Sequence, residues 1–272
     1  MLCKYYNVEE GSLMGHERIG FLPHNKQWKA IVDKLSLYGD GEISIAQIAN
    51  ETLDAVKKTY ESMPFDDSVV KAVYFLTTLS YSAKQEDQIN FLKANGYDID
   101  NQMTLFSLMS SAQTYITTEE GSLEVNKIAK DSVMQAIIDY QQRHETGQTS
   151  FLSEQSENVW SNVGTGAAFC ELARSFFASF TERQLKYYIE RAAASNIDNY
   201  ENLQAFCKQL SAQTKSLADH TFEISKLTQS FAAGWYNKNV INTLPNQNQV
   251  EGFLRMSFGK LREELRREAE VK

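Results

Sequence analysis

The sequence predicts an all-α fold, a bundle of about eight or nine helices with one long heptad-patterned helix near residues 200–240. Only 13 glycines and 3 prolines occur in 272 residues, so the residues that interrupt helices are scarce. Hydrophobic residues make up 42% of the chain and recur at the spacing of amphipathic helices. With 15 Phe and 13 Tyr the chain can also fill a core, which excludes a wholly disordered protein.

The first half of the chain predicts a series of helices separated by clear stop signals. A short helix over 28–38 ends in a Gly-Asp-Gly turn, and a second helix over 44–63 ends at Pro64, which lacks a backbone N–H. Asp66 is a good N-cap for a third helix, whose β-branched residues leave a strand as the alternative. Gly96 follows an asparagine and suits a left-handed helix end. Further helices are predicted over 85–95, 103–115 and 122–144.

A polar segment without periodicity, 146–159, predicts an exposed loop or a domain boundary near residue 150. It would separate an N-terminal helical subdomain, 14–147, from a C-terminal subdomain, 160–272. The helix predicted over 165–194 is rich in aromatic residues and is expected to be central to the fold. The last helix begins near Asn248 and becomes almost wholly charged toward its end.

The most regular pattern is a heptad repeat in the long helix. Its members recur every seven residues, at Leu203, Leu210, Leu217, Ile224 and Phe231. This seam predicts packing along a partner helix, either within the chain or on a second chain. His220 falls at a companion position of the seam, where it is expected to be a hydrogen-bonded core residue or a pH-sensitive one.

Residues 1–13 show no helical pattern and are interpreted as a non-native or disordered leader. The codons GTG-GAG-GAG for residues 8–10 would place a ribosome-binding sequence upstream of Met14. We therefore hypothesise that the natural start is Met14 and that the source is prokaryotic or a phage.

Charge, cysteine content and hydropathy predict a cytoplasmic protein. The chain has 27 Lys and Arg against 35 Asp and Glu, and its net charge of −8 works against non-specific phosphate binding. Its three cysteines form no CxxC pair and are interpreted as reduced thiols. No apolar run approaches the ~18 residues that a membrane-spanning helix needs.

Three motifs resemble sites of known chemistry, and none of them predicts a catalytic residue, a cofactor or a metal. The turn over 162–169 has the glycines of a phosphate-binding turn, but Phe169 occupies the third glycine position, so close helix packing is predicted instead. The segment 38–44 resembles a calcium loop, yet Gln47 would stand where a bidentate carboxylate is required. The four histidines include no pair at helical metal-site spacing.

A protein-contact surface is the remaining candidate site. Arg183, Tyr187 and Arg191 follow the aromatic run of the 165–194 helix, and Arg and Tyr are enriched among the residues that dominate binding energy. Arg262 and Arg266 lie in the mixed-charge last helix. A solvated helix face is the alternative interpretation of both groups.

The function predicted from these observations is that of a non-enzymatic helical adaptor, scaffold or accessory subunit in a prokaryotic multi-protein assembly, and a defence-related assembly is one hypothesis. A protein partner or a homo-oligomer is expected. The alternative is a nucleic-acid-binding accessory protein that uses the basic positions of the last helix. A helical enzyme whose site is not visible in the sequence is the third hypothesis.

Overall fold

A computed structural model describes residues 26–39, 48, 51–52, 59–119, 121–145, 159–197, 200–224 and 231–270 of the chain. Every regular element in these residues is a helix, so the predicted all-α multi-helix fold is confirmed. None of the helices described is long and apolar enough to cross a bilayer.

The helices include most of those predicted, with small shifts at their ends. The α-helices are α1 (Lys26–Gly39), α3 (Asp67–Ser82), α4 (Gln88–Ala94), α5 (Leu105–Ile116), α6 (Leu123–His144), α7 (Gly166–Asn196), α8 (Tyr200–Ile224), α9 (Ala233–Asn239) and α10 (Gln247–Glu270). Three short 3-10 helices accompany them, η1 (Thr59–Glu61), η2 (Met63–Phe65) and η3 (Val159–Asn162).

Side-chain caps explain where three of these helices begin. The Asp66 carboxylate accepts hydrogen bonds from the backbone N–H groups at the start of α3, as the sequence predicts. Ser122 and Thr165 cap α6 and α7 in the same way. At the other end of a helix, Gly96 follows α4 with a φ of 86°, a conformation that glycine adopts without steric cost.

The helix predicted over 44–63 differs at its C-terminal end. Residues 59–61 form η1, Ser62 makes a turn, and Met63–Phe65 forms η2 around Pro64. The Ser62 hydroxyl donates to the Thr59 carbonyl at 2.9 Å, which favours this tight turn over another α-helical turn. The turn places Tyr60 in the core, where its hydroxyl donates to Thr181 Oγ1 at 3.1 Å.

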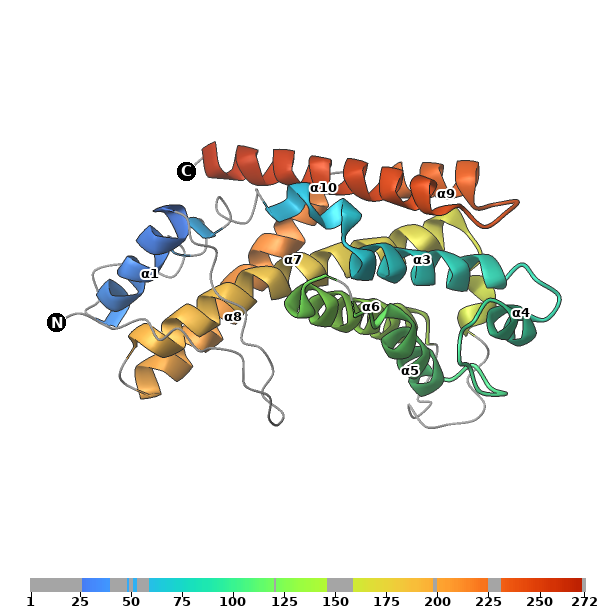
Figure 1. Ribbon diagram of the computed structural model, residues 1–272, viewed down its shortest axis with the longest axis horizontal. Coiled ribbons are helices and arrows are strands. Elements are labelled where there is room, and N and C mark those ends of the chain that lie inside the picture. Colours follow the sequence, from blue (N-terminus) through green and yellow to red (C-terminus); the bar gives the residue numbers. More distant parts are fainter. Residues whose placement is uncertain are drawn as a thin grey trace.

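Helices from both halves of the sequence pack into one arrangement. Figure 1 shows α3 between α10 and α6, and α7 packs against α6, α8, α9 and α3. Residues on both sides of the polar segment 146–159 contribute to a single buried cluster. The segment lies outside the described residues except for its last position, so the two-subdomain organisation remains a prediction.

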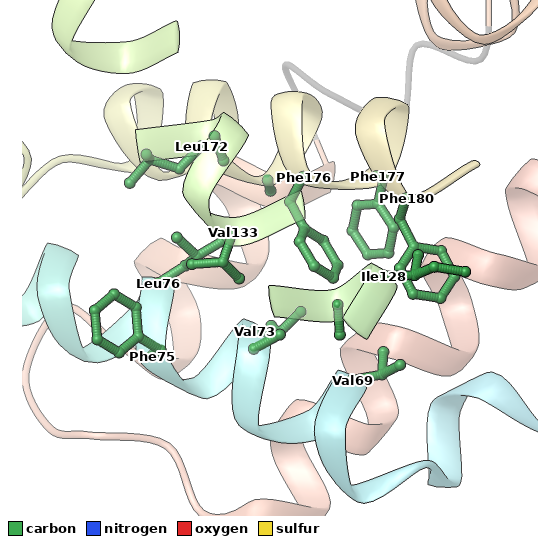
Figure 2. Close-up of a cluster of buried hydrophobic side chains, with 14 of the residues drawn as sticks. Val69, Val73, Phe75, Leu76, Ile128, Val133, Leu172, Phe176, Phe177 and Phe180 are labelled. Carbon is green, nitrogen blue, oxygen red and sulfur yellow. The ribbon is translucent and has the colours of Figure 1, made fainter. Parts of the chain in front are cut away.

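The core is built where α3, α6 and α7 meet. Figure 2 shows the side chains of all three helices directed toward one another. The labelled residues are Val69, Val73, Phe75 and Leu76 from α3, Ile128 and Val133 from α6, and Leu172, Phe176, Phe177 and Phe180 from α7. The aromatic side of α7 is thus buried, which agrees with the central position predicted for the 165–194 helix.

Close helix packing accounts for the glycines of the phosphate-like turn. A Cβ on Gly166 would lie 2.8 Å from Asn237 Oδ1 and 3.1 Å from the Ala233 carbonyl oxygen of α9. A Cβ on Gly164 would lie 3.4 Å from the Ser80 carbonyl oxygen of α3. Both glycines therefore lie where a second helix packs closely, as the sequence predicts.

The heptad seam is only partly described. Leu210 is fully buried and Leu203 and Phe231 are half-buried, and all three pack with the chain's own core. The side chains of Leu217, His220 and Ile224 lie outside the described part of the structure, as do residues 225–230. Continuity of one long helix over 200–240 therefore remains a prediction.

Buried tyrosines predict a loss of stability in alkali. Burial, with a smaller contribution from Glu171, raises the pKa of Tyr140 to about 12, from about 10 in an unfolded chain. Burial also raises the pKa of Tyr60. Above pH 10 the unfolded chain loses these protons first, so stability that is complete below pH 10 declines toward pH 12.

Urea unfolding at several alkaline pH values measures this decline. We expect the Tyr140→Phe variant to lose stability less steeply above pH 10 than the natural chain, because one ionisable group is gone. If the free energy of unfolding falls equally steeply with pH in the two proteins, the buried Tyr140 phenol does not contribute to the alkaline loss of stability.

Candidate functional site

A groove of about 610 Å³ opens between α6, α7 and α8 and is here called the α6–α8 groove. Its charged lining residues are Asp139 and Arg143 of α6, Arg174, Glu182, Arg183 and Lys186 of α7, and Lys215 of α8. Five of these are cationic and two acidic, whereas the whole chain carries a net charge of −8. The groove is thus a locally basic region of an acidic protein.

Helical spacing explains why α7 contributes most of the lining. Its lining residues Ser175, Ser179, Arg183 and Lys186 are separated by three or four positions and share one face of the helix. Phe176, Phe177 and Phe180 occupy positions between them and enter the core instead. One side of α7 therefore stabilises the fold while another lines the groove.

Two serines that line the groove orient two of its three arginines. Ser175 and Ser179 are both buried, with 6% and 7% of their surface exposed. Arg143 of α6 donates to Ser175 Oγ through Nη2, and Arg183 donates to Ser179 Oγ through Nε at 2.9 Å. Each arginine is held by one end of its guanidinium group.

Acidic residues around the groove make longer contacts with the same cations. Arg143 Nη2 lies 3.8 Å from Asp139, and Arg143 Nη1 lies 3.4 Å from Glu171. Arg183 Nη1 lies 3.7 Å from Asp131, and Lys186 lies 4.0 Å from Glu190. All of these side chains are more than a quarter exposed, so each pair contributes only about 0–1 kcal/mol to stability.

A second groove of about 430 Å³ lies among α5, α6 and α7. Its lining includes Leu123, Lys127, Asp131 and Met134 of α6 and Tyr187 of α7. Because Arg183 lines the first groove and its partner Asp131 lines the second, this ion pair joins the two openings. A ligand that follows the α6–α7 surface would cross this pair.

The structure brings together only part of the predicted contact surface. Arg183 and Tyr187 line adjoining grooves, one turn of α7 apart. Arg262 lines neither groove and pairs with Glu61 at 2.5 Å, so its place in a contact surface remains a prediction. The side chains of the other two predicted residues, Arg191 and Arg266, lie outside the described part of the structure.

Sequence reasoning missed the residues that complete the α6–α8 groove. Arg143, Arg174 and Lys215 come from three different helices, and Ser175 was not singled out as an arginine partner. A weak signal existed, because Ser175, Ser179, Arg183 and Lys186 recur at intervals of three or four residues along α7. The contributions of α6 and α8 depend on helix pairing, which periodicity does not reveal.

The cysteines near these helices are poor candidates for nucleophiles. Burial raises the pKa of the Cys170 thiol to about 11, although Arg174 opposes this effect. Burial and Glu190 also raise the pKa of Cys207. A thiol reacts as its thiolate, so both side chains stay in the unreactive form at neutral pH.

His144, the last residue of α6, is paired with a carboxylate of α7. His144 Nε2 lies 2.9 Å from Glu171, and its ring packs against that of Tyr140 at a tilt of 33°, with 4.4 Å between centroids. Within the part of the chain that the structure describes, no group of three His, Cys, Asp or Glu side chains is placed to hold a metal ion.

Comparison of the chain with protein-family models, with curated proteins and with solved structures found no match.

Proposed function

We propose that the protein is a non-enzymatic, cytoplasmic adaptor or accessory subunit of a prokaryotic multi-protein assembly, and that it binds a protein partner across the α6–α8 groove and the groove beside it. The observation that supports this most directly is the junction of the two openings at the Arg183–Asp131 pair, with Tyr187 beside it. An arginine and a tyrosine at one junction are the residue types that most often dominate a protein interface.

The geometry of Arg183 suits a contact residue. Its Nε is held by Ser179, and 36% of its side chain is exposed. Its Nη1 contact to Asp131 at 3.7 Å is too long for a good hydrogen bond. A partner that covers the pair would exclude water from it, and a charge-assisted contact strengthens as water is removed.

Co-purification at natural abundance tests the proposal. A tagged chain expressed from its own locus should recover a specific partner, and Arg183→Ala should reduce that recovery about ten-fold or more, as expected for an interface residue worth at least about 1.4 kcal/mol. Lys71→Ala is the matched control, because Lys71 also forms a partly exposed ion pair, with Asp67 of α3, and lines neither groove.

Equal recovery of the same proteins by the natural chain and by Arg183→Ala, with Lys71→Ala also unchanged, would refute a contact at this junction. Circular dichroism and a thermal melt on each variant show whether a loss of partner is due to a loss of fold.

A further inference from the structure

We infer that the α6–α8 groove recognises a short acidic segment of a protein, through aspartate or glutamate carboxylates that bind its arginines and lysines. This inference rests on the proposed function and names the chemistry of the partner at the same surface.

The charge of the groove differs in sign from that of the molecule. Five cations against two acids line the opening, in a chain of net charge −8. A concave surface with one dominant sign of charge concentrates the field and raises the local concentration of oppositely charged groups. The acidic surface outside the groove repels an acidic segment of a partner. The basic groove is therefore where such a segment is expected to bind.

The arginines are already oriented for carboxylates. Ser175 and Ser179 each occupy one end of a guanidinium group, which leaves Nη1 of Arg143 and Nη1 of Arg183 in longer contacts of 3.4 Å and 3.7 Å with Glu171 and Asp131. A guanidinium group presents N–H donors in a rigid fork that matches a carboxylate. A partner carboxylate can therefore make shorter, charge-assisted bonds there and displace only weak surface ion pairs.

The same surroundings disfavour a nucleic acid. Glu171, Asp131 and Glu190 border the cations and interrupt the basic surface, among the described residues, along which a phosphate backbone would have to run. None of the residues that line the described groove is aromatic, whereas grooves for single strands combine cations with aromatic platforms for the bases. A volume of about 610 Å³ lies within the range of ordinary ligand pockets and suits a short segment.

Fluorescence anisotropy with three labelled probes tests this inference on the full chain. We expect octaglutamate to bind at low salt and to weaken as salt is added, and we expect octalysine and octathymidylate to bind at least about ten-fold more weakly. Arg183→Gln and Arg143→Gln should each weaken octaglutamate binding about ten-fold, a loss of about 1.4 kcal/mol. Lys71→Gln removes the same charge from α3 and should leave binding unchanged.

Three results would overturn the inference: no octaglutamate binding at low salt, binding that neither arginine variant weakens, or equally tight binding of octathymidylate. The two arginine variants come from different helices, so a folding defect in one leaves the other as a test. Partner capture that depends on Arg183 without any octaglutamate binding would overturn this inference alone. Octaglutamate binding with no partner captured from cells would overturn the proposed function alone.

Discussion

Replacing Phe258 by alanine is expected to destabilise the protein by about 3–5 kcal/mol, the usual cost of removing a fully buried aromatic ring. Phe258 of α10 is 1% exposed and contacts three other rings. Its ring centroid lies 5.3 Å from that of Tyr60, 5.4 Å from Phe177 and 5.7 Å from Phe180. These contacts join α10 to η1 and α7, so the cavity left by the substitution would lie between elements that cannot easily close it.

Urea unfolding followed by circular dichroism measures the loss. Phe106→Ala is the matched control, because it deletes the same ring at a position that is 78% exposed, and its effect should stay within about 0.5 kcal/mol. Similar urea midpoints for Phe258→Ala and Phe106→Ala would mean that α10 does not pack on the rings of Tyr60, Phe177 and Phe180.

Replacing Gly166 by valine is expected to destabilise the protein by about 1–3 kcal/mol through overpacking. Any Cβ at this position meets Asn237 Oδ1 at 2.8 Å and the Ala233 carbonyl oxygen at 3.1 Å. The Asn237 side chain can rotate away, but the carbonyl belongs to the backbone of α9. The branched side chain therefore forces α7 and α9 apart at the point where α7 begins.

Gly259→Val is the matched control for this prediction. Gly259 lies in α10, and a Cβ there meets no atom within 4 Å. Valine has a slightly higher helix propensity than glycine, so the control should be neutral or more stable by a few tenths of a kcal/mol. If thermal melts show that Gly166→Val and Gly259→Val are equally stable, α7 and α9 do not approach each other as closely at Gly166 as described.

Local chemistry accounts for the helix ends that could be predicted. Asp66 as a cap and Gly96 as a left-handed stop act within a few residues of themselves, so the sequence displays them directly. Pro64 was predicted to end an α-helix at residue 63, and the structure has η1, a turn and η2 there instead. The choice between a last α-helical turn and a 3-10 turn depends on burying Tyr60 against α7, which is a tertiary contact.

The candidate site also has a part that local sequence predicts and a part that only the packing of helices creates. The side of α7 that carries Arg183 and Tyr187 follows from helical spacing and residue type, both of which are local. The groove itself needs Arg143 from α6 and Lys215 from α8, and 72 residues of sequence separate these two. Arg262 is predicted to lie on a contact surface, and the structure shows that it pairs with Glu61 of η1, a contact that the sequence does not reveal.

Composition and periodicity were sufficient to establish a helical protein, most of its helix boundaries and the buried side of its aromatic helix, because each depends on residues within a turn or two of one another. Only the tertiary structure decided that α3, α6 and α7 share one core and that five cations gather between α6, α7 and α8. Amphipathic helices can pair in many ways at similar free energy, and the pairing is selected by the fit of side chains far apart in sequence.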